Sequence, residues 1–334
     1  MKKLTLIIML CVGAYIYYNN KVKAEGPIKQ EVAERAPQHR APIVIEGSPL
    51  DHLQDAWAEL PEQSRQNGVI NKTYYTTLSD GSRVRNYSVA YDTRKMVPLW
   101  VAYPLHKIYT TPKIDRTDAW AYDDAITVYG EGGYDIIGYE ITEPKIEQRF
   151  QPNVKAGGFN DGENRKLDRG HMLPSASRYN SWQTNAQTFY ATNIFPQNAR
   201  LNQQNWAEVE NGTRASMCAD TLYVVVGTLF ENSSMFVSRG RAITRPSHCY
   251  KLLLRTRNGN SGKAISQITN PDEIMAIGFL YENSAEGNVE PYQAVVSIAE
   301  IEARAGIKFY PTLHPSVANS VKNQKNISDW KAFR

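Results

Sequence analysis

Segments with the alternating pattern of β-strands outnumber helical segments along this chain. Residues 86–91 and 98–103 alternate with a period of two on either side of a polar break, which predicts a hairpin. Further strands are expected at 222–229, 250–255 and 274–280. The strands do not alternate with helices in a repeated βαβ pattern. We therefore predict an α+β fold, with a mainly antiparallel sheet core and flanking helices.

Two segments of the sequence carry helical spacing. Residues 202–213 are expected to form one helix, with Asn202, Trp206 and Glu210 on one face and Trp206 packed in the core. A second helix is expected from Ser297, as its cap, to Ala305, because glycine follows directly.

The N-terminal 24 residues have the pattern of an export signal. Lys2 and Lys3 precede an apolar run over residues 4–18, which at about fifteen residues is shorter than the roughly twenty that span a bilayer. Small residues at Val22 and Ala24 place cleavage after Ala24. We expect a secreted or periplasmic protein with no stable membrane insertion after cleavage. The alternative is an uncleaved anchor.

The mature chain is expected to contain a leader and one large domain. Residues 25–72 are predicted to be a flexible leader, because residues 25–47 are rich in proline and charge, with an accessory helix from Ser48 that ends at Pro61. Residues 73–334 form the predicted domain. Within it, residues 131–163 show little periodicity and are expected to be a long surface excursion.

The charge of the whole chain does not indicate a nucleic-acid partner. The sequence has 38 basic and 34 acidic residues, but four of the lysines lie in the signal segment, so the remainder is near neutral. Residues 232–265 nevertheless contain seven Lys or Arg and no acid. This segment is either the solvated face of a sheet or a face that contacts phosphate.

The cysteine count predicts one disulfide. Cys11 leaves with the signal, which leaves Cys218 and Cys249 as an even pair in an exported chain. Two free thiols are the alternative.

The residues with most chemical potential lie between positions 168 and 210. His171 is the candidate general base, because an ordinary imidazole can accept a proton from water at neutral pH. Arg169, two residues away, would share its face of a strand and could meet charge on a phosphate. Asp168 would point the other way and make local hydrogen bonds.

Oxygen ligands for a metal are expected on the helix that follows. The amide of Asn202 suits Mg²⁺, although asparagine also favours helix caps. Glu210, about 12 Å further along a continuous helix, would act through metal-bound water. Asn193 and Gln197 could contact the histidine or a phosphate, or could satisfy backbone groups near a turn.

These motifs resemble the DNA/RNA non-specific endonuclease family of the ββα-metal superfamily. The resemblance rests on the string from Asp168 to His171 and on the spacing of Asn193, Asn202, Trp206 and Glu210. It extends loosely from about residue 87 to 309.

The resemblance implies a ββα-metal active-site motif that hydrolyses DNA and RNA without sequence specificity and leaves 5′-phosphate ends. His171 would be the general base, Asn202 the direct ligand of Mg²⁺, with Mn²⁺ as a substitute, and Glu210 a partner of the metal's water. Arg169 and an upstream arginine, best matched by Arg116, would stabilise phosphate charge, and Arg214 would assist.

Two other functions are compatible with the same resemblance. One is a catalytically silent relative that binds nucleic acid or a surface partner, and the other is a metallophosphoesterase with a small substrate. The sequence leaves homodimer formation open.

Overall fold

The computed structural model describes residues 58–64, 66–123, 128–130, 133–135, 144–160 and 166–333. All of them belong to one compact unit of the chain. The expected signal segment, and the leader with its accessory helix up to residue 57, lie outside the described residues. Within the described part, no helix is long and apolar enough to cross a membrane.

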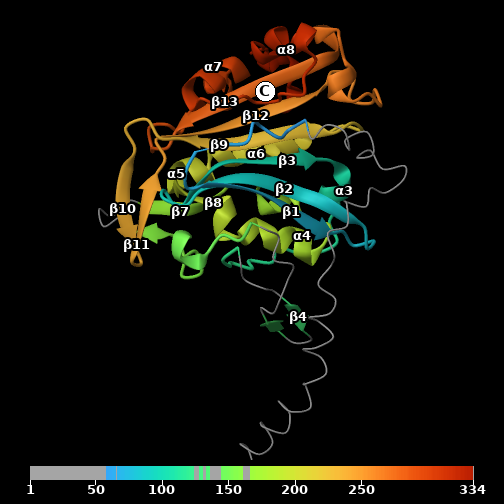
Figure 1. Ribbon diagram of the computed structural model, residues 1–334. Coiled ribbons are helices and arrows are strands. Elements are labelled where there is room, and N and C mark those ends of the chain that lie inside the picture. The colour runs from blue at the N-terminus through green and yellow to red at the C-terminus, as the bar shows by residue number, and fades with distance from the viewer. Residues whose placement is uncertain are drawn as a thin grey trace, which may run out of the picture. The chain divides into compact units, whose positions relative to one another are not determined.

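A seven-stranded antiparallel sheet forms the centre of the fold (Figure 1). Its strands, in spatial order, are β1 (Val69–Thr77), β2 (Arg83–Asp92), β3 (Val97–Leu105), β9 (Leu222–Leu229), β12 (His248–Thr256), β13 (Ile274–Glu282) and β14 (Val295–Val296). Each neighbouring pair is antiparallel. The α+β fold with a mainly antiparallel sheet is therefore confirmed, as are the predicted hairpin, now β2–β3, and the three later strands.

Three smaller sheets accompany the central one. They consist of β6 (Phe159–Asn160), β7 (Lys166–His171) and β8 (Ile194–Asn198), of β10 (Ser234–Ser238) with β11 (Arg241–Arg245), and of β4 (Val128–Gly130) with β5 (Gly133–Asp135). The α-helices are α3 (Lys107–Thr110), α4 (Trp182–Ala186), α5 (Ala199–Gln203), α6 (Asn205–Ala215), α7 (Ile298–Ala305) and α8 (Pro315–Lys322). Short 3₁₀ turns are η2 (Gln148–Phe150), η3 (Ser175–Ser177), η4 (Gln187–Phe189), η5 (Ala191–Asn193), η6 (Ile265–Gln267), η7 (Pro271–Glu273), η8 (Pro291–Gln293), η9 (Ile327–Asp329) and η10 (Lys331–Phe333).

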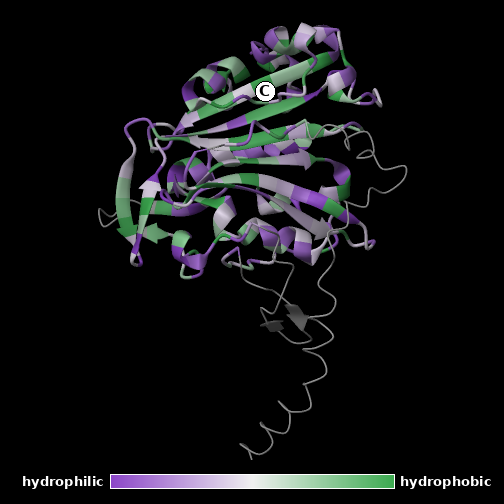
Figure 2. Ribbon diagram, in the orientation of Figure 1, coloured by the Kyte–Doolittle hydropathy of each residue, from purple (hydrophilic) through white to green (hydrophobic). Residues whose placement is uncertain are grey.

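Both faces of the central sheet are covered. One face packs against β7, β8 and α6 through residues such as Ile194 and Trp206. The other packs against α7 and α8 through Ile298 and Val317. Figure 2 accordingly shows hydrophobic residues along β12 and β13. Such burial on two sides explains why β9 reads as a continuous apolar run.

The helix predicted to begin after Ser297 is confirmed. The Ser297 side chain accepts a hydrogen bond from the Glu300 backbone N–H, and the Glu300 carboxylate accepts one from the Ser297 backbone N–H. Gly306 ends the helix in the left-handed conformation at φ 66°.

The domain begins earlier than the expected boundary at residue 73. That boundary would cut through β1, and Ala58 and Glu59 are buried at 1% exposure each. Glu59 forms an ion pair with Arg85 of β2. The sequence does not indicate β1, because a lysine in the middle of the strand does not look like a buried residue. In the structure this lysine, Lys72, is buried in an ion pair with Asp123 at 2.6 Å.

The excursion expected over residues 131–163 is not wholly a surface segment. In its described part, Ile146, Val154 and Phe159 belong to the core, and Gln151 is fully buried. Gln151 accepts a hydrogen bond from the Asp123 backbone at 2.9 Å. Hydrogen bonds between side chains and the backbone therefore fix the residues around Gln151, although their sequence has no periodic pattern.

The predicted disulfide is wrong. Cys218 and Cys249 are both free. Cys249 lies near the start of β12, whereas Cys218 contacts the position of Gly259, beyond the end of that strand. Seven strand residues at about 3.3 Å each separate the two ends by roughly 20 Å, and a disulfide requires Cα atoms within about 7 Å.

We expect both thiols to be detectable in unreduced protein. Denaturing the protein in an alkylating reagent, without a reductant, should modify Cys218 and Cys249 completely, as peptide mass spectrometry can measure. Omitting the denaturant should protect the buried Cys249 and leave the more accessible Cys218 reactive. A peptide joining the two cysteines would contradict the structure.

Candidate active site

The candidate base and its neighbours lie on β7, which pairs with β8. In the antiparallel register, Gly170 faces Phe195 and His171 faces Ile194. A Cβ atom at position 170 would come within 2.6 Å of the Gln197 Cβ, so only glycine lets the strands approach this closely. The close pairing fixes the directions of the side chains on either side of Gly170.

His171 lies in an aromatic pocket that the sequence analysis did not foresee. Its ring centroid is 5.3 Å from that of Trp120 and 5.1 Å from that of Phe189, which it meets edge to face. Its Nε2 atom is buried without a hydrogen-bond partner in the structure. Neither aromatic residue stands in a periodic segment, so nothing in the sequence marks them.

The imidazole of His171 is neutral at ordinary pH. Burial and, to a smaller extent, the charges of Arg116 and Arg169 together lower its pKa to about 3, although a hydrogen bond to the backbone of Arg169 acts in the opposite direction. The free Nε2 lone pair can therefore accept a proton.

Arg169 and Arg116 supply positive charge beside the imidazole. The Arg169 guanidinium stacks on Trp120, 3.4 Å from the ring centroid, and its Nη1 donates to the Val154 carbonyl at 2.7 Å. Since Arg169 and His171 both contact Trp120, they share one face of β7, as expected. Arg116 lies 4.7 Å from the Phe189 centroid and donates to the Ser175 hydroxyl at 2.8 Å.

Asp168 points away from these residues and holds α5. Its Oδ2 accepts hydrogen bonds from Nδ2 of Asn202 at 2.9 Å and from Nε2 of Gln203 at 2.8 Å. The first bond fixes the amide of Asn202 so that its oxygen, the atom a cation would take, is directed elsewhere. Asp168 therefore makes local hydrogen bonds, as expected, and its partners lie on α5.

The prediction of one continuous helix over residues 202–213 is wrong. The chain breaks at Gln204, with φ −117° and ψ −107°, into α5 and α6. Asn288 stabilises the break, since it accepts from the Asn205 backbone at 3.1 Å and donates to the Gln204 side chain at 2.6 Å. Asn202 is not a helix cap, because Asn198 caps α5. The 12 Å separation argued along one helix does not apply.

Glu210 lies on α6 and interacts electrostatically with the buried Lys251. Burial raises its pKa, whereas the charges of Lys251 and Arg214 lower it. Lys251, on β12, is fully buried, and its Nζ lies 5.0 Å from the Trp206 ring centroid. Burial lowers the pKa of Lys251 to about 8, although Glu210 acts in the opposite direction. In the sequence, Lys251 is distinguishable only as one of the basic residues of segment 232–265, and nothing there indicates its interaction with Glu210.

Asn193 and Gln197 do not face the site. Asn193 is fully buried, its Nδ2 donates to the carbonyls of Leu173 and Thr188 at 2.9 and 2.7 Å, and its Oδ1 accepts from the Leu173 backbone at 2.9 Å. Gln197 is also fully buried and donates to the sulfur of Cys249 at 3.8 Å. Their contacts in the structure support the backbone and the core, and the catalytic role of Asn193 and the substrate-binding role of Gln197 stay predictions.

The basic segment 232–265 is not a free phosphate-contacting face. Its seven cations contact other parts of the protein: Arg239, Arg241 and Arg245 donate to carbonyls, Lys251 lies beside Glu210, Arg255 lies over Trp330, Arg257 pairs with Asp329, and Lys263 pairs with Glu273. Local basicity therefore does not locate the substrate.

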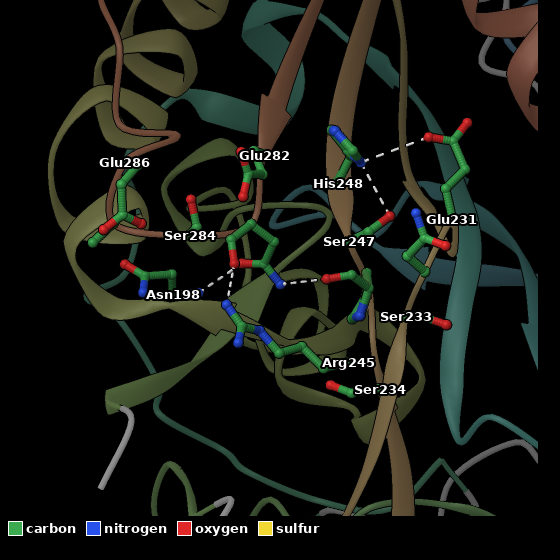
Figure 3. Close-up of a pocket in the computed structure, with 14 residues that line it drawn as sticks. Asn198, Glu231, Ser233, Ser234, Arg245, Ser247, His248, Glu282, Ser284 and Glu286 are labelled. Carbon is green, nitrogen blue, oxygen red and sulfur yellow. Dashed lines mark hydrogen bonds and ion pairs between the residues drawn. The ribbon is translucent and has the colours of Figure 1, made fainter. Parts of the chain in front are cut away.

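A cavity of about 600 Å³ lies at the ends of β8, β12 and β13 (Figure 3). Its walls include Asn198, His248 and Glu282, together with Glu231, which Arg304 binds at 2.9 Å. None of the predicted site residues lines it. The hollow is thus separate from the base and its arginines.

The family model for DNA/RNA non-specific endonucleases matches residues 65–316. This chain belongs to that family. It is accordingly a DNA/RNA endonuclease by family, a hydrolase of phosphodiester bonds.

Relatives of this endonuclease occur in bacteria and in mitochondria. A nuclease of a Nostoc strain is 24% identical over 239 residues, covering 71% of this chain and 76% of the relative. The nuclease of Serratia marcescens is 26% identical, covering 68% and 74%. Human mitochondrial nuclease EXOG is also 26% identical, covering 76% of this chain and 63% of the relative. In a crystal structure of an EndoG/EndoGI complex, a chain at 17% identity shares the fold with a TM-score of 0.51, covering 81% and 95%.

The depressed pKa of His171 predicts a dependence of stability on pH. Unfolding restores the ordinary pKa of 6.5, so the unfolded chain binds a proton more readily than the endonuclease between pH 6.5 and about 3. This contribution to stability is complete above pH 6.5 and is lost as the pH falls through that window. The fall in melting temperature from pH 7 to 5 should therefore be smaller in His171→Gln than in wild type. His314→Gln, the control, should keep the wild-type difference, and equal falls in all three proteins would refute the assignment.

Asn193→Ala tests the supporting role of this asparagine. Losing its side chain leaves buried backbone groups unpaired, so we expect about 2 to 4 kcal/mol lower stability. Urea unfolding measures the change. A variant with wild-type stability and little activity would instead restore Asn193 to direct catalysis.

Proposed function

We propose that this protein is an exported, Mg²⁺-dependent endonuclease that cuts both DNA and RNA without reading sequence and leaves 5′-phosphate ends. The observation that supports the chemistry best is the neutral His171, whose free Nε2 lies among Trp120, Phe189 and two arginines. The N-terminal segment of the sequence supports export, with a periplasmic or secreted location.

The oxygen donors of α5 and α6 fit a hard cation. The Asn202 amide is oriented by Asp168, and Glu210 offers a carboxylate on the next helix. Among the described residues no cluster of three or more His, Cys, Asp or Glu could hold a metal. A site with one direct amide ligand needs no such cluster, because Mg²⁺ keeps much of its water and prefers oxygen donors. When bound, the cation would supply positive charge to the phosphate.

The protein's own residues account for the proton and for the phosphate charge. Nε2 of His171 accepts a proton from the attacking water, whose oxygen bonds to phosphorus as the bond from phosphorus to O3′ breaks, and O3′ takes up a proton from solvent water. The phosphate remains on the 5′ carbon. Arg169 and Arg116 face the charge that grows on the phosphate oxygens, and stacking on Trp120 and Phe189 holds both guanidinium planes.

Lack of sequence preference follows from what contacts the substrate. Arginine side chains and a cation bind phosphate groups, which are the same at every position of the polymer. Such contacts serve DNA and RNA alike.

Digestion of plasmid DNA and of RNA tests the function directly. Purified protein should cleave both with Mg²⁺ or Mn²⁺, lose activity with a chelator, and yield ends that accept label from a kinase only after phosphatase treatment. Binding without cleavage would identify a silent relative, and hydrolysis of small phosphodiesters alone would identify a different phosphoesterase.

Two variants separate the base from the metal ligand. We expect His171→Ala to lower kcat by about 100 to 10,000-fold, the range for loss of a general base, with unchanged Mn²⁺ affinity by calorimetry. Asn202→Ala should weaken Mn²⁺ binding as well. Asn319→Ala, on α8 and exposed, serves as the control. Near-wild-type activity in His171→Ala, or wild-type Mn²⁺ affinity in Asn202→Ala, would overturn that residue's role.

A further inference from the structure

Two arginines of the β10–β11 hairpin bind the backbone of the segment 144–160. Arg239 donates through Nη2 to the Ala156 carbonyl at 2.8 Å and through Nη1 to the carbonyls of Asn153 and Gly157 at 3.4 Å each. Arg241 donates to the Arg149 carbonyl at 2.8 Å. A planar guanidinium with several donors in a fixed geometry can bind several carbonyls in one orientation. Arg239 therefore fixes residues 153–157 as a group.

The same segment holds the arginine beside the base. The Val154 carbonyl, between two of the carbonyls that Arg239 binds, accepts the hydrogen bond from Nη1 of Arg169 at 2.7 Å. The Val154 side chain is fully buried. Arg169 is thus held on one side by a carbonyl that Arg239 positions and on the other by the ring of Trp120.

The hairpin that carries Arg239 has a well-defined turn. Ser238 pairs with Arg241, and the two residues between them have positive φ, 49° at Arg239 and 72° at Gly240, as in a type I′ turn. On one side of the hairpin, Phe236 packs edge to face on Phe159 at 6.3 Å, next to the segment that Arg239 binds. The hairpin can therefore act as a rigid support.

We propose that Arg239 is a positioning residue for Arg169, acting through the backbone carbonyls of residues 153–157, so that the guanidinium of Arg169 is held where the scissile phosphate binds. The proposal rests on the proposed nuclease function. Arg239 contacts neither the base nor the metal ligand, and its terminal nitrogens donate to carbonyls that lie between it and Arg169. The carbonyl oxygens stabilise both guanidinium groups, which offsets the repulsion by which the charge of Arg239 lowers the pKa of Arg169.

A double-mutant cycle distinguishes positioning from direct phosphate contact. Arg239→Asn removes the guanidinium and suits the turn, because asparagine accepts positive φ. We expect Arg169→Ala to lower kcat by about 100-fold, the effect of losing one group that stabilises the transition state. Arg239→Asn should lower kcat by about 10-fold with KM within 2-fold, as for a small misplacement of a catalytic group. In the Arg169→Ala background, Arg239→Asn should have no further effect.

Two controls separate geometry from charge. Arg257→Asn removes the same charge from a residue whose partners are Asp272 and Asp329, and it should leave kcat within 2-fold of wild type. Arg239→Lys keeps the charge but not the planar fork, so most of the defect should remain. Full activity in Arg239→Lys, a further 10-fold loss in the double variant, or wild-type kcat in Arg239→Asn would each overturn the proposal.

Hydrogen exchange provides a readout that does not depend on activity. Amide exchange over residues 149–157 should accelerate in Arg239→Asn and not in Arg257→Asn, while exchange in β12 and β13 should stay slow, which shows that the domain remains folded. Unchanged exchange in 149–157 would contradict the role of Arg239. An inactive wild-type protein with faster exchange in Arg239→Asn would reject the nuclease function but retain the support of this segment.

Discussion

The pairing of β7 with β8 is the constraint on which the active site depends. Gly170 permits the two strands to approach with Gln197 behind them, and Asn193 ties the turn after His171 to the backbone at Leu173 and Thr188. All these contacts are buried. They give one short strand a defined orientation, so that Arg169 and His171 face Trp120 while Asp168 faces α5.

Electrostatics and burial act together on His171. Two neighbouring guanidinium groups and an aromatic pocket both favour a neutral imidazole. The same surroundings attract a phosphate, whose negative charge would offset the arginines and make the imidazole more basic once the substrate is bound. A weak base in the free protein can thereby become a stronger one at the moment it is needed. On α6, Lys251 and Arg214 favour the charged form of Glu210, which burial alone would disfavour.

Much of the fold, and the shared face of Arg169 and His171 on β7, could be predicted from the sequence, because they depend on local patterns. Alternation indicated β2 and β3, a continuous apolar run indicated β9, and the capping residues indicated α7. The failures involve distant contacts. The strand β1 could not be predicted, because Lys72 is buried only through an ion pair with Asp123, 51 residues away. The break at Gln204 could not be predicted either, because it depends on Asn288. The cysteine count said nothing about the length of β12 between the two thiols. Trp120, Phe189 and Lys251 acquire their roles only when separate elements meet.

The break at Gln204 divides the site between two layers of the molecule. Asn202 belongs to a short helix that Asp168 ties to β7, whereas Glu210 belongs to a longer helix packed on the central sheet through Trp206 and Val209. A straight helix would transmit any shift of one residue to the other as a rigid rod. Here the break, which Asn288 stabilises, separates the two donors, so the position of each is set by a different sheet and independently of the other.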